Sequence, residues 1–274
     1  MILYSMISNV SLEGLFATGF LPGMMIMFGV CVYSYFVFRN KKEIVRKPVP
    51  TFRELLLVLK DGFWALMLPV IIFGGIFSGA FTANEAAVVA CVYALFVELV
   101  IHRTVKIQDV KKITVSSAVT SATLLIIVAG ASCFGRLLTL ESIPGKIAEA
   151  VIATIDSPVM FLLAMNILLL IIGMFMDIIS ATMILGPVFL PMLDAFGVNW
   201  MHFGLIMTVN LAIGYCTPPM GVSLYITGSI SNKDLIYVSK AVIPFLLIQI
   251  AVLFFITYFP DAVLWLPRIG GYLE

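Results

Sequence analysis

Long apolar runs recur along the whole chain and are separated by short polar segments. Runs of about 17–25 residues are long enough to cross a bilayer as helices. Such spans are expected at about 13–38, 63–80, 84–101, 158–176 and 239–259. A further run at about 113–140 is rich in Ser, Thr, Ala and Gly, which permit close packing of helices. The pattern predicts an all-α polytopic membrane protein.

The apolar stretch from Gly173 to Gly221 is interrupted in a way that ordinary membrane spans avoid. Its interruptions are Gly173, Asp177, Gly186-Pro187, Gly214, Thr217-Pro218-Pro219 and Gly221. Broken helices are tolerated in lipid only where they are buried in protein or line a polar cavity. Half-helices that end in mid-membrane leave carbonyls free for a cation and N–H groups free for an anion. The stretch therefore predicts a binding site of the kind found in ion-coupled transporters.

The composition agrees with a membrane protein and excludes a soluble domain. Hydrophobic residues make up 62% of the chain and charged residues 11%, and the mean hydropathy is +1.13. Nothing suggests nucleic-acid binding. The cysteines lie singly in apolar segments, without the spacing of a disulfide framework or a metal site. The first residues, MILYSMISNVSLEG, lack the basic region and cleavage site of a signal peptide.

Two basic loops predict the orientation. The first contains Arg39, Lys41, Lys42, Arg46, Lys47 and Arg53, and the second Arg103, Lys106, Lys111 and Lys112. Both are expected in the cytoplasm by the positive-inside rule. Capping boxes at Thr51–Glu54 and Thr82–Glu85 predict helix starts. The helix after Thr51 is expected to lie along the interface first, either as a docking arm or as a plain connection.

The backbone at Gly214–Met220 is the candidate cation site. Uncoiled backbone offers carbonyls that a continuous helix keeps occupied, and Thr217 adds a hydroxyl. Pro218 and Pro219 lack N–H donors, so they release upstream carbonyls. The alternative is a proline-kinked helix that only packs.

Asp177 and Arg136 are the candidate functional charges. Asp177 is the only carboxylate deep in the broken region, and a buried charge is expected to be paired or functional. It would accept substrate hydroxyl or N–H groups, or balance a cation; alternatively, it caps the helix that follows. Arg136 is the only basic residue well inside an apolar segment, and the alternative for it is snorkelling beside Glu141.

The segment around Arg136 also contains a candidate turn. Ala129-Gly130-Ala131-Ser132 is a place where a re-entrant hairpin is expected to turn. An amphipathic interfacial helix is predicted over residues 142–155, and Asp156-Ser157-Pro158 is expected to cap the next membrane helix.

Three motifs, GGIFSGAFTANEAA, GMFMD and NLAIGYCTPPMG, occur in this order. Together they resemble the large membrane subunit (DctM-like) of the tripartite ATP-independent periplasmic (TRAP) transporters, and the resemblance covers essentially the whole chain. It implies an inverted-repeat, elevator-type ion transporter fold in the bacterial inner membrane. It also implies sodium-coupled uptake of an organic acid, delivered by a periplasmic substrate-binding protein (DctP-like), with a small membrane subunit (DctQ-like) as partner.

The resemblance also implies residue roles. Gly173, Gly214, Thr217 and Met220 match the positions of a sodium site in that family, and no other cofactor is expected. The expected substrate-binding residues are Asp177, Arg136, Asn210 and Thr217. An intramembrane enzyme is the first alternative, but Asp177 has no acidic partner and His102 and His202 are peripheral. A channel is the second, but no ring-forming filter motif is present.

The resemblance further suggests how the chain is divided. Residues 1–50 are expected to end a first repeat, 51–112 to form an arm helix and scaffold spans, 113–238 a transport domain, and 239–274 a final span and tail. A faint internal repeat supports this, because Met1-Ile-Leu-Tyr4 before Pro22 resembles Val222-Ser-Leu-Tyr225 before Pro244. The chain is therefore expected to be the tail of repeat one plus all of repeat two, and unable to transport without the missing half.

Overall fold

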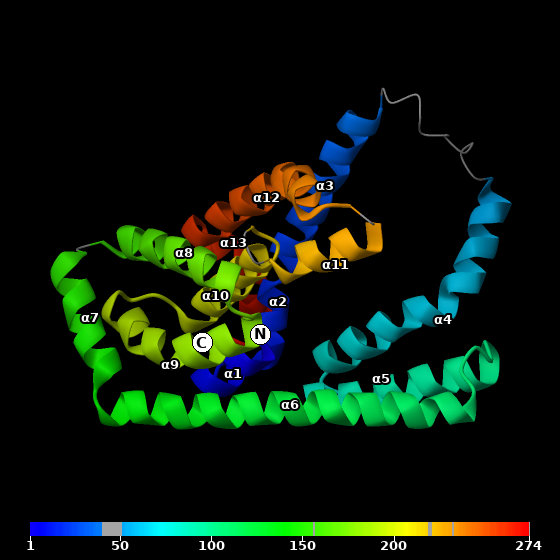
Figure 1. The fold of residues 1–274 in the computed structure, drawn as a ribbon, viewed down its shortest axis with the longest axis horizontal. Coiled ribbons are helices and arrows are strands. Elements are labelled where there is room, and N and C mark those ends of the chain that lie inside the picture. The colour runs from blue at the N-terminus through cyan, green and yellow to red at the C-terminus, as the bar shows by residue number, and fades with distance from the viewer. Residues whose placement is uncertain (40–50, 156, 219–220, 232, 274) are drawn as a thin grey trace. The chain divides into compact units, whose positions relative to one another are not determined.

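The computed structural model describes residues 1–39, 51–155, 157–218, 221–231 and 233–273, and every regular element in these ranges is a helix (Figure 1). The helices are α1 (Ile2–Ser8), α2 (Leu12–Thr18), α3 (Phe20–Phe38), α4 (Phe52–Phe77), α5 (Ala83–Phe96) with a π-helical turn (Val97–Ile101), α6 (Ile107–Leu140), α7 (Ile143–Thr154), α8 (Pro158–Phe175), α9 (Ile178–Ala195), α10 (Trp200–Tyr215), α11 (Val222–Ser231), α12 (Leu235–Tyr258) and α13 (Pro260–Ile269).

The described residues contain six helices that are long and apolar enough to cross a membrane. A seventh is added if α4 counts as one span, because its two halves, Phe52–Lys60 and Gly62–Phe77, meet at an angle of 63°. The prediction of an all-α polytopic membrane protein is confirmed. The chain forms two compact units, residues 37–124 and residues 1–36 with 125–274. The predicted domain boundaries stay a prediction.

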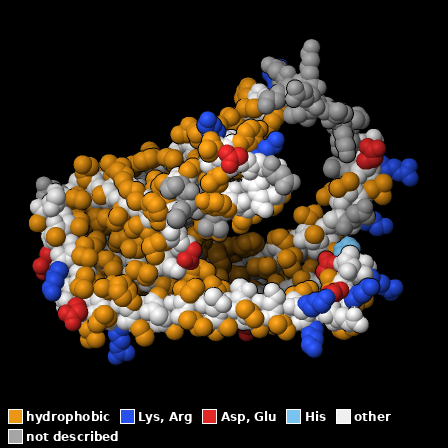
Figure 2. All heavy atoms as spheres, viewed as in Figure 1, with side chains coloured by type: hydrophobic (Ala, Val, Ile, Leu, Met, Phe, Trp, Pro, Cys, Tyr) orange, Lys and Arg blue, Asp and Glu red, His pale blue; other side chains and the backbone are white. Residues whose placement is uncertain are grey.

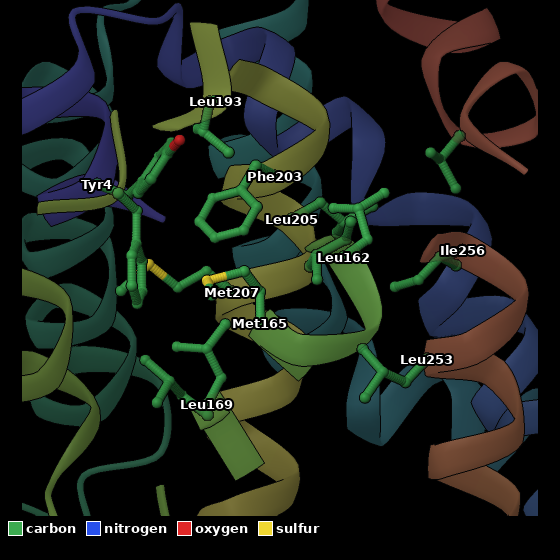
Figure 3. Packing of buried hydrophobic residues seen from close by; sticks show 14 of the residues in the cluster. Tyr4, Leu162, Met165, Leu169, Leu193, Phe203, Leu205, Met207, Leu253 and Ile256 are labelled. Carbon is green, nitrogen blue, oxygen red and sulfur yellow. The ribbon is translucent and has the colours of Figure 1, made fainter. Parts of the chain in front are cut away.

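Helix α10 forms the centre of the larger unit. Its sequence, WMHFGLIMTVNLAIGY, is apolar on all sides, and a helix of that kind is stable only when it is surrounded. It packs against α2, α8, α9 and α12. Figure 3 shows Phe203, Leu205 and Met207 of α10 among Leu162 and Met165 of α8 and Leu253 of α12. Dispersion between closely packed side chains stabilises such a core in lipid, where water no longer drives apolar burial.

The short helix α1 is fastened to this core by Tyr4. Its side chain is 1% exposed, and its hydroxyl donates a hydrogen bond to the Trp200 carbonyl at 2.9 Å. Because a buried phenol needs a hydrogen-bond partner, this bond fixes α1 against the start of α10. Helix α1 also packs on α9.

Apolar side chains cover most of the face of the larger unit that Figure 2 shows. Phe28 is 70% exposed and Ile126 is 74% exposed. Exposed apolar surface on this scale is expected of helices that face lipid rather than water.

Both predicted capping boxes are present. The Thr51 N–H donates to Glu54 Oε2 at 2.8 Å, and the Thr82 N–H donates to Glu85 Oε2 at 2.8 Å. The Thr82 hydroxyl also accepts from the Glu85 N–H at 3.4 Å. These reciprocal bonds satisfy N–H groups that the first helical turn leaves without a partner, so α4 and α5 begin where the sequence predicts.

The predicted hairpin turn at Ala129–Ser132 is wrong. Helix α6 runs through these residues without a break, because small residues without a proline are compatible with a helix. The chain turns instead after Glu141, where Ser142 adopts a left-handed conformation with φ of 53°. Helix α7 then covers most of the predicted segment 142–155.

The predicted break at Gly186-Pro187 is also wrong, because α9 continues through Pro187 and Pro191. A proline removes one helical hydrogen bond and bends the helix, but neighbouring protein makes this tolerable. The break at Asp177 is confirmed, since α8 ends at Phe175 and α9 begins at Ile178, and α10 ends at Tyr215, just before the break predicted at Thr217. Gly173 and Gly214 themselves lie inside the last turns of α8 and α10. Lys41, Lys42, Arg46, Lys47 and Asp156 lie outside the described residues.

Candidate functional site

Helices α8 and α10 approach each other backbone to backbone at Gly173 and Gly214. A Cβ atom added to Gly214 would lie 2.7 Å from the Gly173 Cα, and one added to Gly173 would lie 3.2 Å from the Gly214 Cα. A real Cβ atom essentially never has a contact shorter than 3.0 Å, so a neighbouring atom would have to move. Gly214 therefore requires glycine, a Cβ at Gly173 would make a tight contact, and the ends of two interrupted helices are held side by side.

Oxygen atoms gather where α10 ends. The Thr217 N–H donates to the Gly214 carbonyl at 2.9 Å, and the Thr217 hydroxyl donates to the Ile213 carbonyl at 2.7 Å. The Gly221 N–H donates to the Thr217 carbonyl at 3.2 Å. The Ile213 carbonyl also accepts from the Cys216 N–H at 3.0 Å, but the Thr217 carbonyl keeps a second lone pair and the Thr217 hydroxyl oxygen remains an acceptor after donating its proton. The segment thus offers several oxygen ligands of the hard type that sodium requires.

The structure therefore brings together three of the four predicted sodium ligands: Gly173, Gly214 and Thr217. Met220 lies outside the described residues. The assignment of these residues to sodium stays a prediction, as does the contribution of Thr217 to substrate binding.

Asp177 lies in the break between α8 and α9 and is exposed. Its carboxylate accepts a hydrogen bond from the Ser180 N–H at 3.0 Å. Asp177 is thus the N-cap of α9, which is the structural alternative considered for it. A carboxylate oxygen has further lone pairs, so capping is compatible with a contact to substrate.

Arg136 lines a cavity of about 600 Å³ in the larger unit. The walls come from α1, α6, α7 and α9 and from the turn before α7; its polar side chains are Arg136, Ser132 and Ser142, and its apolar residues include Ile7, Met183 and Leu190. Within the described residues, no acidic side chain forms an ion pair with Arg136. Its guanidinium therefore has donors available for an anion in the cavity.

Two prolines of α9, Pro187 and Pro191, also line this cavity. They are one helical turn apart, and neither has an N–H to donate. The carbonyls of Met183 and Pro187 are consequently without the helical donor that other residues would supply. Met183 and Pro187 both line the cavity, so residues of its α9 wall have backbone acceptors without a helical donor.

Asn210 is fully buried, and it contacts α8 instead of lining the Arg136 cavity. Its Nδ2 donates to Asn166 Oδ1 at 2.7 Å and to the Asn166 carbonyl at 3.1 Å. Asn166 Nδ2 in turn donates to Thr257 Oγ1 of α12 at 3.0 Å. The predicted role of Asn210 in substrate binding stays a prediction.

The predicted site residues thus fall into separate groups. Gly173, Gly214 and Thr217 surround the ends of α8 and α10, whereas Arg136 lies in the α6–α9 cavity, which neither Asp177 nor Asn210 lines. Sequence reasoning missed Asn166. It had a signal, because Asn166 is the one amide in the otherwise apolar run of α8 and polar side chains in such runs join helices.

The sequence also matches known proteins. A sequence model of the family described as "Tripartite ATP-independent periplasmic transporter, DctM component" matches residues 1–262. The C4-dicarboxylate TRAP transporter large permease protein DctM of Pseudomonas aeruginosa is 39% identical over 98% of this chain and 62% of its own length. The sialic acid TRAP transporter large permease protein SiaM of Vibrio cholerae is 35% identical over 98% of this chain and 63% of its own.

A third relative is a longer protein than the first two. The isethionate TRAP transporter permease protein DctMQ of Oleidesulfovibrio alaskensis is 37% identical over 94% of this chain, but only 41% of its own length is matched. The chain thus spans less than two thirds of the length of each of these relatives.

Proposed function

Because the chain belongs to the DctM component family of the tripartite ATP-independent periplasmic transporters, we propose that it forms part of a permease for sodium-coupled uptake of an organic acid. It is a multi-pass membrane protein with a transport function and no enzymatic one. The bacterial inner membrane is the proposed location. The transport cycle is proposed for the complete permease that contains this chain.

The observation that supports sodium coupling is the meeting of two interrupted helices at Gly173 and Gly214. Carbonyls at such ends are not all occupied by helical hydrogen bonds. With the Thr217 hydroxyl beside them, they form a donor set that suits a hard cation. Gly173, Gly214, Thr217 and Met220 would hold the ion.

The proposed substrate is an organic anion. The relatives named above carry names for C4-dicarboxylates, sialic acid and isethionate, which are carboxylates or sulfonates. Arg136 supplies a guanidinium for such a group, and Ser132 and Ser142 supply hydroxyls. Asp177 would accept hydrogen bonds from substrate hydroxyl or N–H groups.

Two partner proteins are proposed. A small membrane subunit of the DctQ type would complete the permease, and the name of the isethionate relative, DctMQ, fits such a pairing. A periplasmic substrate-binding protein of the DctP type would deliver the organic acid.

Uptake by the complete permease in liposomes tests the proposal. The permease and its binding protein would be supplied with a C4-dicarboxylate, sialic acid or isethionate under an inward sodium gradient, a matched potassium gradient, or none. We expect one acid to accumulate only under the sodium gradient. Equal accumulation under the potassium gradient would refute sodium coupling, and downhill flux without counterflow would indicate a channel.

A further inference from the structure

A buried amide pair joins the two helices whose ends form the candidate sodium site. Asn166 and Asn210 are each 0% exposed, and Thr257 of α12 is 1% exposed. The bond from Asn210 Nδ2 to Asn166 Oδ1 measures 2.7 Å. Polar side chains buried this completely carry a large desolvation cost, which only well-made hydrogen bonds offset.

The amide pair lies on the same helix faces as the glycine contact. Asn166 precedes Gly173 by seven residues, and Asn210 precedes Gly214 by four. Residues seven or four apart lie on one face of an α-helix. The Asn166–Asn210 pair and the Gly173–Gly214 pair are therefore two successive contacts along one α8–α10 interface.

The two contacts differ in how strongly they specify alignment. Glycines permit close approach, but they form no directional side-chain bond and oppose sliding only through steric contact. A buried amide pair opposes sliding directionally, because sliding breaks its hydrogen bonds and leaves polar atoms unsatisfied. A single buried asparagine specifies register in coiled coils for this reason, at a cost in stability.

The Asn166–Asn210 pair carries such a cost in stability. Asn210 Oδ1 is buried and accepts no hydrogen bond from any described residue. A buried acceptor without a hydrogen bond is destabilising, because nothing offsets the loss of its contact with water. Two apolar side chains would avoid this cost, so stability alone does not account for the amides.

We propose that Asn166 and Asn210 are a positioning pair for the sodium site. They hold α8 and α10 in the register that sets the Gly173 backbone against Gly214, and Thr257 ties the pair to α12. This proposal rests on the sodium coupling proposed above. It gives Asn210 a role in aligning the cation ligands, which does not require contact with substrate.

Three leucine variants of the complete permease separate positioning from plain stability: Asn166→Leu, Asn210→Leu and the double variant. The melting temperature is measured first in choline chloride and then with increasing sodium chloride. We expect each single variant to melt lower in choline, because one amide is left unpaired. We expect the double variant to regain much of the loss, because replacing both partners removes the unsatisfied groups.

The sodium requirement provides the decisive readout. We expect all three variants to need about tenfold more sodium for half of the maximal thermal stabilisation, which corresponds to 1.4 kcal/mol. Thr257→Val is the matched control: it removes the bond to α12 but keeps the amide pair, and its sodium requirement should change less than twofold.

If the leucine variants do not fold, Asn210→Ser replaces them, because a serine hydroxyl bonds to its own helix and is too short to reach α8. It should show the same tenfold change. A double variant, or Asn210→Ser, that binds sodium like the wild type would overturn the positioning role. A wild-type permease that sodium does not stabilise would instead refute the sodium site itself, and the positioning role with it.

Discussion

Helices α10 and α6 have contrasting surroundings. Most residues of α10 are buried among other helices of this chain, whereas none of the most apolar 18-residue window of α6 is buried. Both are apolar enough for a membrane, so hydropathy alone does not separate them. The difference shows that the surroundings of the proposed cation site on α10 are formed by this chain itself. The exposed faces of α6 are left to lipid or other protein.

The largest expected effect is a loss of stability from a glycine substitution on α10, and it tests the contrast between α10 and α6. In Gly214→Ala, the new Cβ would lie 2.7 Å from the Gly173 Cα, and backbone atoms cannot rotate away. We expect a loss of about 3 kcal/mol or more in stability, seen as little folded protein in detergent and no uptake.

Gly130→Ala on α6 is the matched control, because a Cβ there meets nothing within 4 Å. It should express and melt like the wild type. Equal behaviour of the two variants would mean that α8 and α10 do not touch at their glycines.

Arg136→Gln should strongly reduce uptake at low substrate concentration without unfolding the protein. The side chain is exposed in the cavity and forms no ion pair with the described acidic residues, so its removal costs little stability. Loss of a charge-assisted hydrogen bond to an anion, about 1.5–3 kcal/mol, predicts roughly 10-fold to 150-fold weaker apparent affinity.

The measurement for Arg136→Gln is the substrate dependence of uptake, with the melting temperature as a check on folding. Arg136→Lys keeps the charge and should retain part of the affinity. Unchanged affinity in the glutamine variant would contradict the assignment of the cavity.

Thr217→Ala should have a smaller effect, because most proposed sodium ligands are backbone carbonyls. Loss of one hydroxyl ligand, on the order of 1 kcal/mol, predicts about a fivefold rise in the sodium concentration for half-maximal uptake. Thr217→Ser keeps the hydroxyl and should behave like the wild type. If the sodium dependence of the alanine variant is unchanged, the cation lies elsewhere.

The smallest expected effect is on stability at Asp177. Asparagine is as good an N-cap as aspartate, so Asp177→Asn should keep the melting temperature while weakening substrate recognition. Asp177→Ala removes the cap as well and should cost about 1 kcal/mol more. Normal uptake in both variants would leave Asp177 with the capping role alone.

Features that depend on neighbouring residues in sequence were predictable. Both capping boxes involve residues three apart, and most spans follow from apolar length alone, but Ile178–Ala195, which is also long enough to cross a membrane, was interpreted as interrupted. The turn expected at Ala129–Ser132 failed because small residues without a proline can continue a helix. The break expected at Gly186-Pro187 failed because neighbouring protein makes a proline inside α9 tolerable. The bond between Asn166 and Asn210 joins residues far apart in the chain, so the sequence offered only the single amide in each apolar run.

The prolines of α9 have a consequence for mutational scanning. Two residues that line the Arg136 cavity, Met183 and Pro187, have main-chain carbonyls that Pro187 and Pro191 leave without a helical donor. Truncating the side chain of Met183 does not remove such an acceptor. Replacing Pro187 with alanine does, because it adds the missing N–H and closes the helical bond. At Pro187, an alanine substitution therefore changes the main chain as well as the side chain. A conventional alanine scan would attribute the effect of the lost main-chain acceptor to the loss of the proline ring.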